Sequence, residues 1–256
     1  MMFYTHTTFI GIDPTAGVRP FTYASIDGDQ RLLALGHGEL DEILAFAAGQ
    51  RQAMVAVCAP RRPNQGVMEN EQVRAGLNPV PRPGRWQNFR LCEYQLRQHR
   101  ISSPQTPALE EKSPRWMRMG FLLFRRLEAL GYREYGTPEA ERQTLEVYPH
   151  ASYTVLLGQA PYPKHTLEGR LQRQLLLYEL KLDIPDPMRF LEEITRHRLL
   201  KGRLPEEELY APGELDALVA AHTAWLALNR PEQITCLGDP VEGQQVLPVG
   251  ELKAHY

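Results

Sequence analysis

The 256-residue sequence contains only three cysteines, Cys58, Cys92 and Cys236, and none of them forms a CxxC-type pair. This number and spacing indicate neither a disulfide framework nor a structural zinc site, so we expect reduced thiols. Uninterrupted apolar runs of about 18 residues, which a membrane span requires, are also lacking. The polar start, residues 1–6, has neither the basic nor the apolar region of a signal peptide. We therefore expect a globular, cytoplasmic protein with no membrane partner.

Several common catalytic signatures are lacking as well. The sequence has no Walker-type glycine loop, no GxSxG elbow and no GxGxxG turn, which argues against P-loop nucleotide hydrolysis, serine-hydrolase chemistry and dinucleotide binding. His150, His165 and His222 are isolated, with no HxxxH-type pair that would suggest a zinc site. The apolar fraction of 43% is sufficient for a substantial core. Other residue types must therefore supply any chemistry.

The formal net charge of −2 hides a basic middle of the chain. Residues 60–133 contain 14 lysines and arginines against six aspartates and glutamates, a local net charge of +8. Most of these basic residues are arginines, which pair with phosphate groups better than lysines do. The pattern is expected of a polyanion-binding surface, and an ordinary solvated arginine-rich surface is the alternative. The candidate nucleic-acid contacts are Arg61, Arg62, Arg90, Lys164 and Arg170.

The first 60 residues predict a three-stranded meander, a helix and a fourth strand. Strands are expected at residues 9–13, 21–26, 31–37 and 53–58. Asp27-Gly28-Asp29 is a strong hairpin-turn sequence between the second and third strands. Apolar residues at helical spacing predict a helix over 39–48, which Gly49 ends. Because this helix serves as a crossover, the fourth strand should lie parallel to the first.

The rest of the chain predicts a long insertion, one short strand and several helices. Residues 60–89 are rich in proline, glycine, asparagine and arginine and show no sustained periodicity, so we expect them to be irregular, within an insertion over about 60–133. The fifth strand is expected at residues 144–148. Helices are expected over residues 89–99, 114–130, 167–180, 187–199 and 213–228. The predicted fold is a single α/β domain over residues 1–256, with a mixed five-stranded sheet flanked by helices and a helical C-terminal half.

Three carboxylates stand where a sheet-and-helix site could gather them. Asp13 closes the first strand, and the following Pro14 favours extended backbone at that position. Glu146 lies in the fifth strand, on the face opposite its apolar neighbours. Asp216 lies at the margin of the apolar stripe of the last helix, whose alanines permit a close approach to a sheet. Each acid alone also has an ordinary explanation, as a turn aspartate, a solvated strand glutamate and a first-turn helix acid.

A convergence of these carboxylates would suit hard divalent cations. Magnesium and manganese ions prefer oxygen ligands and usually keep several waters. Two such ions about 4 Å apart can activate an attacking water and stabilise the leaving oxygen in phosphodiester cleavage. Asp13, Glu146 and Asp216 are therefore the candidate metal ligands and catalytic residues, with Mg²⁺ or Mn²⁺ as the candidate cofactor.

Seven short motifs follow one another along nearly the whole chain. They are Gly11-Ile12-Asp13, Cys58-Ala59-Pro60, Arg90-Leu91-Cys92-Glu93, Thr106-Pro107, Glu146-Val147-Tyr148-Pro149, Lys164 through Gly169-Arg170, and Leu215-Asp216-Ala217-Leu218. In this order they resemble the domain-of-unknown-function family 429, whose members are described as predicted nucleases of RNase H fold. The resemblance implies an RNase H-like fold and a metal-dependent nuclease with its acids at Asp13, Glu146 and Asp216.

The second motif departs from the family pattern. The pattern resembles Ile-Asp-Ala-Pro, whereas this chain has Cys58 in place of the aspartate. A thiol is a poor ligand for magnesium and a better one for softer metals. Three outcomes are consistent with this change: Glu146 suffices with the two aspartates, the site has changed metal, or catalysis has been lost. Cys58 itself is expected to be a small buried thiol.

The leading interpretation is a metal-dependent nuclease that cleaves phosphodiester bonds of DNA or RNA. One alternative is a catalytically inactive RNase H-like module that binds nucleic acid or protein, which a ligand lost at Cys58 would explain. Another is a nucleotide-binding phosphotransfer protein, because the strand-Asp-turn loop also resembles the phosphate-binding loop of actin and the sugar kinases. Those proteins need a duplicated domain with a second such loop, and this sequence shows one, so this alternative ranks last.

Overall fold

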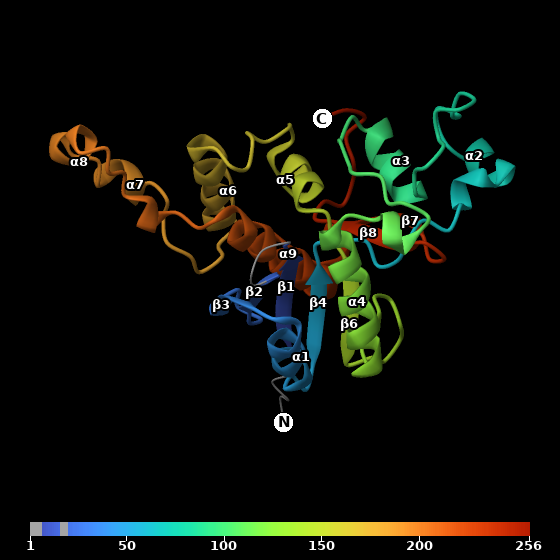
Figure 1. Ribbon diagram of the computed structural model, residues 1–256, viewed down its shortest axis with the longest axis horizontal. Coiled ribbons are helices and arrows are strands. Elements are labelled where there is room, and N and C mark those ends of the chain that lie inside the picture. Colours follow the sequence, from blue (N-terminus) through green and yellow to red (C-terminus); the bar gives the residue numbers. More distant parts are fainter. Residues whose placement is uncertain (1–6, 16–19) are drawn as a thin grey trace.

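A mixed β-sheet runs through the molecule, with helices on both of its faces (Figure 1). The structure is a computed structural model and describes residues 7–15 and 20–256. Within these residues the sheet has eight strands in the order β3-β2-β1-β4-β6-β8-β7, and β5 pairs with β6. The predicted mixed α/β class is confirmed, but the sheet is larger than the five strands expected.

The N-terminal part of the sheet forms as the sequence predicts. Its elements are β1 (Thr8–Pro14), β2 (Phe21–Ile26), β3 (Leu32–Gly38), α1 (Leu40–Ala48) and β4 (Ala53–Val57). The first three strands are an antiparallel meander, and β4 lies parallel to β1 after the crossover through α1. The Asp27 carboxylate caps the turn between β2 and β3 by accepting hydrogen bonds from the Asp29 and Arg31 amides.

The C-terminal part of the sheet differs from the prediction. Its strands are β5 (Arg133–Glu134), β6 (Arg142–Glu146), β7 (Thr235–Asp239) and β8 (Gly243–Leu247). The predicted fifth strand is β6, parallel to β4 and beginning two residues early, whereas the other three strands were not predicted. β7 and β8 form a hairpin that joins the sheet through the pairing of Glu146 with Gln245. The hairpin depends on tertiary packing, because Leu237 and Leu247 are buried in a cluster with residues of α3 and α5.

The segment predicted as an insertion is part of the folded body. Its helical elements are η1 (Val67–Glu69), α2 (Glu71–Ala75), α3 (Leu91–Gln98), η2 (Glu110–Lys112) and α4 (Arg115–Ala129). Residues 60–89 are mainly irregular, as expected. Phe124 and Leu127 of α4 are buried in the same cluster as Ile10, Ile12 and residues of α1, so α4 and α1 cover one face of the sheet together.

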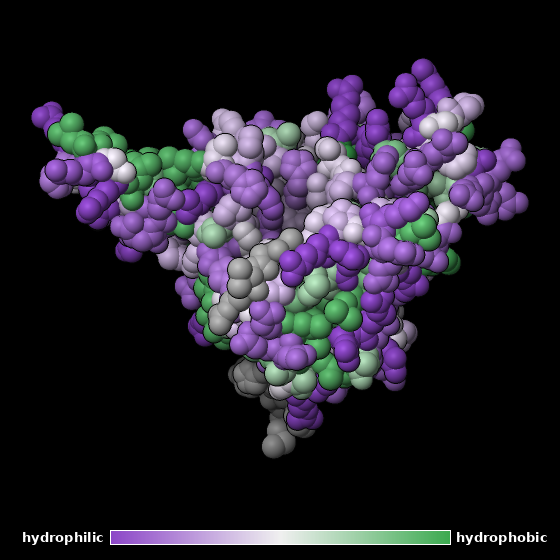
Figure 2. All heavy atoms as spheres, viewed as in Figure 1, coloured by the Kyte–Doolittle hydropathy of each residue, from purple (hydrophilic) through white to green (hydrophobic). Residues whose placement is uncertain are grey.

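The C-terminal helices lie mostly on the opposite face or beyond it. The remaining elements are α5 (Pro149–Leu157), α6 (Leu167–Glu179), α7 (Arg189–Glu192), α8 (Arg196–Leu200), η3 (Glu206–Glu208), α9 (Pro212–Asn229) and η4 (Pro231–Gln233). The helices expected over 167–180 and 213–228 are α6 and α9, and α5 was not predicted. The helix expected over 187–199 is replaced by α7 and α8, because the Thr195 hydroxyl accepts a hydrogen bond from the Arg198 amide and starts a new helix. These two helices project from the body, and hydrophobic and charged residues alternate on their surface (Figures 1 and 2).

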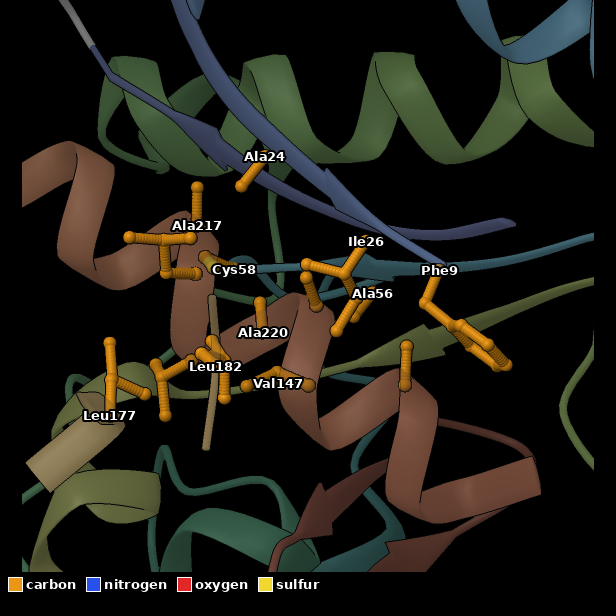
Figure 3. Packing of buried hydrophobic residues seen from close by; sticks show 14 of the residues in the cluster. Phe9, Ala24, Ile26, Ala56, Cys58, Val147, Leu177, Leu182, Ala217 and Ala220 are labelled. Carbon is orange, nitrogen blue, oxygen red and sulfur yellow. The ribbon is translucent and has the colours of Figure 1, made fainter. Parts of the chain in front are cut away.

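α9 lies unusually close to the sheet, and a glycine in β1 permits this approach. Ala217 and Ala220 of α9 face Ala56 and Cys58 of the β4 segment in the core (Figure 3). Alternation along β1 points Gly11 toward α9, since Ile10 and Ile12 point to the other face. A Cβ atom at Gly11 would overlap the Ala217 carbonyl oxygen. Gly11 and the alanines of α9 therefore set the distance between helix and sheet.

Candidate functional site

Asp13 and Asp216 meet at the carboxyl end of β1, on the face of the sheet that α9 covers. Asp13 lies two residues after Gly11 and so points to the same face. Asp216 immediately precedes Ala217, the α9 residue that lies against Gly11. The close packing of Gly11 against α9 therefore brings the two carboxylates near each other. Two of the three predicted acids are assembled in this way.

The ammonium group of Lys164 joins this pair of carboxylates. Lys164 lies in the loop between α5 and α6, and its Nζ is 2.8 Å from Asp216 Oδ2. The Asp216 side chain is 7% exposed, whereas that of Lys164 is 43% exposed, so a buried carboxylate is paired with a partly solvated cation. The positive charge of Lys164 also acts on Asp13. Lys164 was predicted as a nucleic-acid contact, and the structure places it beside both aspartates.

The electrostatics of the pair favour added positive charge. Burial raises the pKa of Asp13 from 3.8 to about 7, with a further contribution from the negative charge of Asp216, while Lys164 opposes the shift. Burial also raises the pKa of Asp216, against the opposing charge and hydrogen bond of Lys164. One ammonium group thus compensates two crowded, desolvated carboxylates only in part.

Cys58 occupies the position next to this pair, at the end of β4. Its thiol is buried and donates a weak hydrogen bond to the Asp216 backbone carbonyl, with an Sγ to O distance of 3.5 Å. Burial raises the pKa of the Cys58 thiol well above its usual value, and the nearby charge of Asp13 raises it further. The thiol is therefore protonated at neutral pH, and the expectation of a small buried thiol is confirmed. It supplies no third negative charge.

These residues line part of a cavity of about 720 Å³. Pro14 and Gly213 form part of the wall beside Asp13, and Gly213 has no side chain to separate the start of α9 from the Asp13 carboxylate. The further polar and aromatic residues of the lining are Trp116, Tyr148, His150, Tyr162, His165 and Arg173. A cavity of this size, with carboxylates and cationic groups in its wall, can accommodate a phosphate-bearing ligand.

Glu146 lies on the opposite face of the sheet and does not join Asp13 and Asp216. It pairs in register with Val57, which points toward α4, whereas Cys58 points toward α9. Its Oε1 accepts a hydrogen bond of 2.8 Å from the buried Arg90 guanidinium, and its Oε2 accepts one of 2.9 Å from the Arg61 amide. The three acids were expected to converge, but only Asp13 and Asp216 do so. The alternation of side chains along β6 directs Glu146 to the other face, where it forms an ion pair with Arg90.

The predicted nucleic-acid contacts also separate into different environments. Arg90 is completely buried and pairs with Glu146, and the buried Arg61 guanidinium pairs with Glu128 at 2.8 Å. Arg62 donates to the Val241 carbonyl. Arg170 donates to backbone carbonyls of the segment before α9, including Leu209 at 2.7 Å, and so holds α6 against it. Lys164 is the member of this set that lines the cavity.

Other charged and titratable groups also line the cavity. The Arg173 guanidinium is buried and donates hydrogen bonds to the carbonyls of Tyr162 and Gly169, which fixes a positive charge in the wall. His150 follows the carboxyl end of β6, and burial lowers the pKa of its imidazole, with the charge of Arg173 adding to the effect. The position of Tyr148 and His150 at the carboxyl end of a predicted strand was a usable signal. Nothing in the sequence indicated that Arg173 would be buried.

The described ranges 7–15 and 20–256 contain no group of three or more histidine, cysteine, aspartate or glutamate side chains arranged to hold a metal ion. This agrees with the finding that two carboxylates, rather than three, meet at the end of β1. In the same ranges, no helix combines the length and apolar character that crossing a membrane requires.

Comparison with known proteins identifies the family to which the chain belongs. Searches among curated proteins and among solved structures found no match. A family model does match, and it covers residues 11–243, a range that includes Asp13, Lys164 and Asp216. The chain therefore belongs to the family described as protein of unknown function (DUF429).

Proposed function

We propose that this protein is a divalent-metal-dependent phosphodiesterase that cleaves DNA or RNA, with Asp13 and Asp216 as ligands of Mg²⁺ or Mn²⁺. The observation that carries the proposal is the convergence of the partly buried Asp13 and the buried Asp216 carboxylates on the Lys164 ammonium group at the carboxyl end of a central strand. Ligands in open α/β sheets bind at the carboxyl ends of the strands, which agrees with this location.

The fold supports an RNase H-like arrangement around the site. The order β3-β2-β1-β4-β6 combines an antiparallel meander with two strands parallel to β1, reached through helical crossovers. In the proposed arrangement, the first acid comes from the central strand and the second from the last long helix. The β7–β8 hairpin and β5 are additions at the far edge of this common sheet.

The residues present fit a magnesium or manganese ion. Magnesium is commonly bound through one or two carboxylates, with waters and substrate phosphates completing its shell, so Asp13 and Asp216 suffice as protein ligands. Their raised pKa values reflect crowded negative charge that a divalent cation would neutralise. A bound metal would activate water and stabilise the leaving oxygen. Cys58 is left out of the ligand set, since a thiol is a poor ligand for these hard cations.

The basic groups of the cavity are suited to hold the substrate phosphate. Lys164 carries its charge on a flexible stem beside Asp216, whereas Arg173 is fixed by two backbone carbonyls. Both can neutralise phosphate oxygens close to the carboxylates. The proposal leaves Glu146 out of the ligand set. Its carboxylate lies on the other face of the sheet and already accepts hydrogen bonds from the Arg90 guanidinium and the Arg61 amide.

A cleavage assay with matched variants tests the proposal. Labelled single-stranded and duplex DNA and RNA are incubated with Mn²⁺ or with EDTA, using the native protein, Asp13→Asn and Asp216→Asn. We expect Mn²⁺-dependent cleavage by the native protein and its loss, by about 100-fold or more, in both variants. Asp41→Asn, an exposed aspartate of α1, is the control and should cleave normally. Native levels of cleavage in Asp13→Asn, or cleavage in EDTA, would refute the assignment.

A second candidate function is a non-enzymatic nucleic-acid-binding module of the same fold. The observation that favours it is the neutral Cys58 thiol at the strand end beside Asp13 and Asp216. In that case, binding of the labelled nucleic acids should be measurable without any cleavage in Mn²⁺, and Asp13→Asn should bind them at least as tightly as the native protein.

A further inference from the structure

Three aromatic side chains line the same cavity as the carboxylates, and we call them its aromatic region. Trp116 comes from the first turn of α4, Tyr148 follows β6, and Tyr162 lies in the loop before α6. Trp116 and Tyr148 are half-buried, and Tyr162 is 58% exposed. Three elements that are distant in the sequence thus place aromatic side chains around one cavity. Aromatic rings with an accessible face are the usual platforms for nucleobases.

The aromatic region is held on a rigid frame. Tyr148 precedes Pro149, and Tyr162 stands between Pro161 and Pro163, all of which line the cavity. Proline restricts the backbone on both sides of Tyr162 and after Tyr148, so less conformational entropy is lost when a ligand stacks on these rings. The Tyr162 carbonyl also accepts a 2.8 Å hydrogen bond from the buried Arg173, which ties this loop to α6.

Charged and aromatic groups share this cavity in a combination that matches one nucleotide. The carboxylates and Lys164 are suited to a metal-bound phosphate, and the aromatic and proline side chains provide an apolar surface within the same space of about 720 Å³. Small-ligand sites commonly have volumes of about 300–1,000 Å³. A nucleobase attached to the phosphate would therefore find an apolar surface within the same cavity.

We propose that Trp116, Tyr148 and Tyr162 bind one unpaired nucleobase beside the phosphate held at Asp13 and Asp216, so that the substrate class is single-stranded nucleic acid. This inference rests on the proposed function and adds the substrate class to it. In a duplex, the base faces are stacked on neighbouring pairs and cannot contact a side-chain ring. A single strand exposes those faces, and stacking on aromatic side chains tolerates any base sequence.

The test measures binding in EDTA, where no cleavage can occur. The probe is a fluorescein-labelled oligothymidylate of about ten nucleotides, alone or annealed to its complement, followed by fluorescence anisotropy. We expect the single strand to bind at least 10-fold tighter than the duplex. Trp116→Ala and Tyr162→Ala should each weaken single-strand binding by about 5- to 100-fold, in line with the known cost of removing a stacking partner. Trp86→Ala is the matched control, because Trp86 stacks with Arg74 outside this cavity.

A second variant separates stacking from folding. Trp116 also packs against the core cluster beneath α4, so its loss could weaken the fold. Trp116→Phe keeps an aromatic face and should restore most of the affinity, and thymidine 5′-monophosphate should compete better than deoxyribose 5-phosphate. Equal binding of single strand and duplex, with native affinity in Tyr162→Ala, would overturn the inference. If that result were accompanied by Mn²⁺-dependent cleavage that requires Asp13, the proposed nuclease function would stand without the base-binding inference. If single-strand binding depended on Trp116 and Tyr162 but no cleavage occurred in Mn²⁺, the nuclease function would be rejected instead.

Discussion

Lys164 Nζ lies 2.8 Å from Asp216 Oδ2, in a pair formed across 52 positions of the sequence. The lysine provides positive charge at a point where the carboxylates of the partly buried Asp13 and the buried Asp216 are crowded together. A metal cation would bind most favourably at the position of the Lys164 ammonium group, and it would compete with Lys164 for Asp216. This relationship leads to the first prediction.

Replacing Lys164 should make the protein more dependent on metal for stability. In EDTA, Lys164→Gln leaves the buried acids without their ammonium partner and should lower the free energy of unfolding by about 1–2 kcal/mol, a value reduced by the partial exposure of the lysine. Mn²⁺ should then raise the melting temperature of Lys164→Gln more than that of the native protein. Thermal denaturation with and without Mn²⁺ measures both effects, with exposed Lys201→Gln as the control. An identical Mn²⁺ shift in both proteins would contradict the competition.

The glycine in β1 should be indispensable for the position of α9. In Gly11→Ala the new methyl group overlaps the Ala217 carbonyl, which cannot move without shifting the helix, so we expect a loss of about 3 kcal/mol of stability or more. The displacement should also weaken Mn²⁺ binding, because Asp216 moves with α9. Gly28→Ala is the control, since a Cβ there meets no atom within 4 Å. Chemical denaturation and calorimetric Mn²⁺ titration are the measurements; similar stability of the two variants would disprove the packing argument.

Glu146 should prove to be structural rather than catalytic. Glu146→Gln removes the charge that compensates Arg90, which has no exposed surface, and should cost about 3 kcal/mol, or on the order of 10 °C in melting temperature. The folded fraction should keep its affinity for Mn²⁺. The control is Glu232→Gln, which lies on the surface. A variant with native stability but no cleavage would instead support the catalytic role that the sequence suggested.

His222 should make the stability depend on pH in the acidic range. Its imidazole is buried in α9, its Nδ1 lies 2.8 Å from Gln30 Oε1, and burial lowers its pKa from 6.5 to about 4. The unfolded chain therefore binds an additional proton between pH 6.5 and 4, so the native state is fully favoured above pH 6.5 and loses about 2–3 kcal/mol as the pH falls to 4.

The variant His222→Gln should lack this component of the pH dependence. Denaturation of both proteins at a series of pH values, compared as a difference, removes the contributions of other titrating groups. A difference in unfolding free energy that stays constant from pH 7 to pH 4 would show that the histidine is not held neutral by burial.

The elements of the N-terminal half follow from local patterns. The turn at Asp27, the apolar strand of β4 and the helix ended by Gly49 are each encoded within a few residues, and all appear where expected. The β7–β8 hairpin is different, because its polar residues carry no strong pattern and its stability comes from contacts with α3, α5 and the edge of β6. A single helix was expected over residues 187–199, where the structure has the two short helices α7 and α8, because the apolar spacing continues across the helix cap at Thr195.

The sequence by itself determined the start of the sheet, the buried thiol at Cys58 and two acids placed at the ends of elements, because backbone preference and side-chain alternation are local properties. Only the tertiary structure decided that Asp13 and Asp216 share Lys164, while Glu146 and Arg90 pair on the other face. The fate of a charged side chain depends on the partner that meets it when distant segments pack, and burial without a partner is too costly. Side-chain alternation along the strand predicts that Glu146 and Leu145 point to opposite faces of the sheet. Only the packing of α4, α9 and the β7–β8 hairpin decides which of the two faces holds the site.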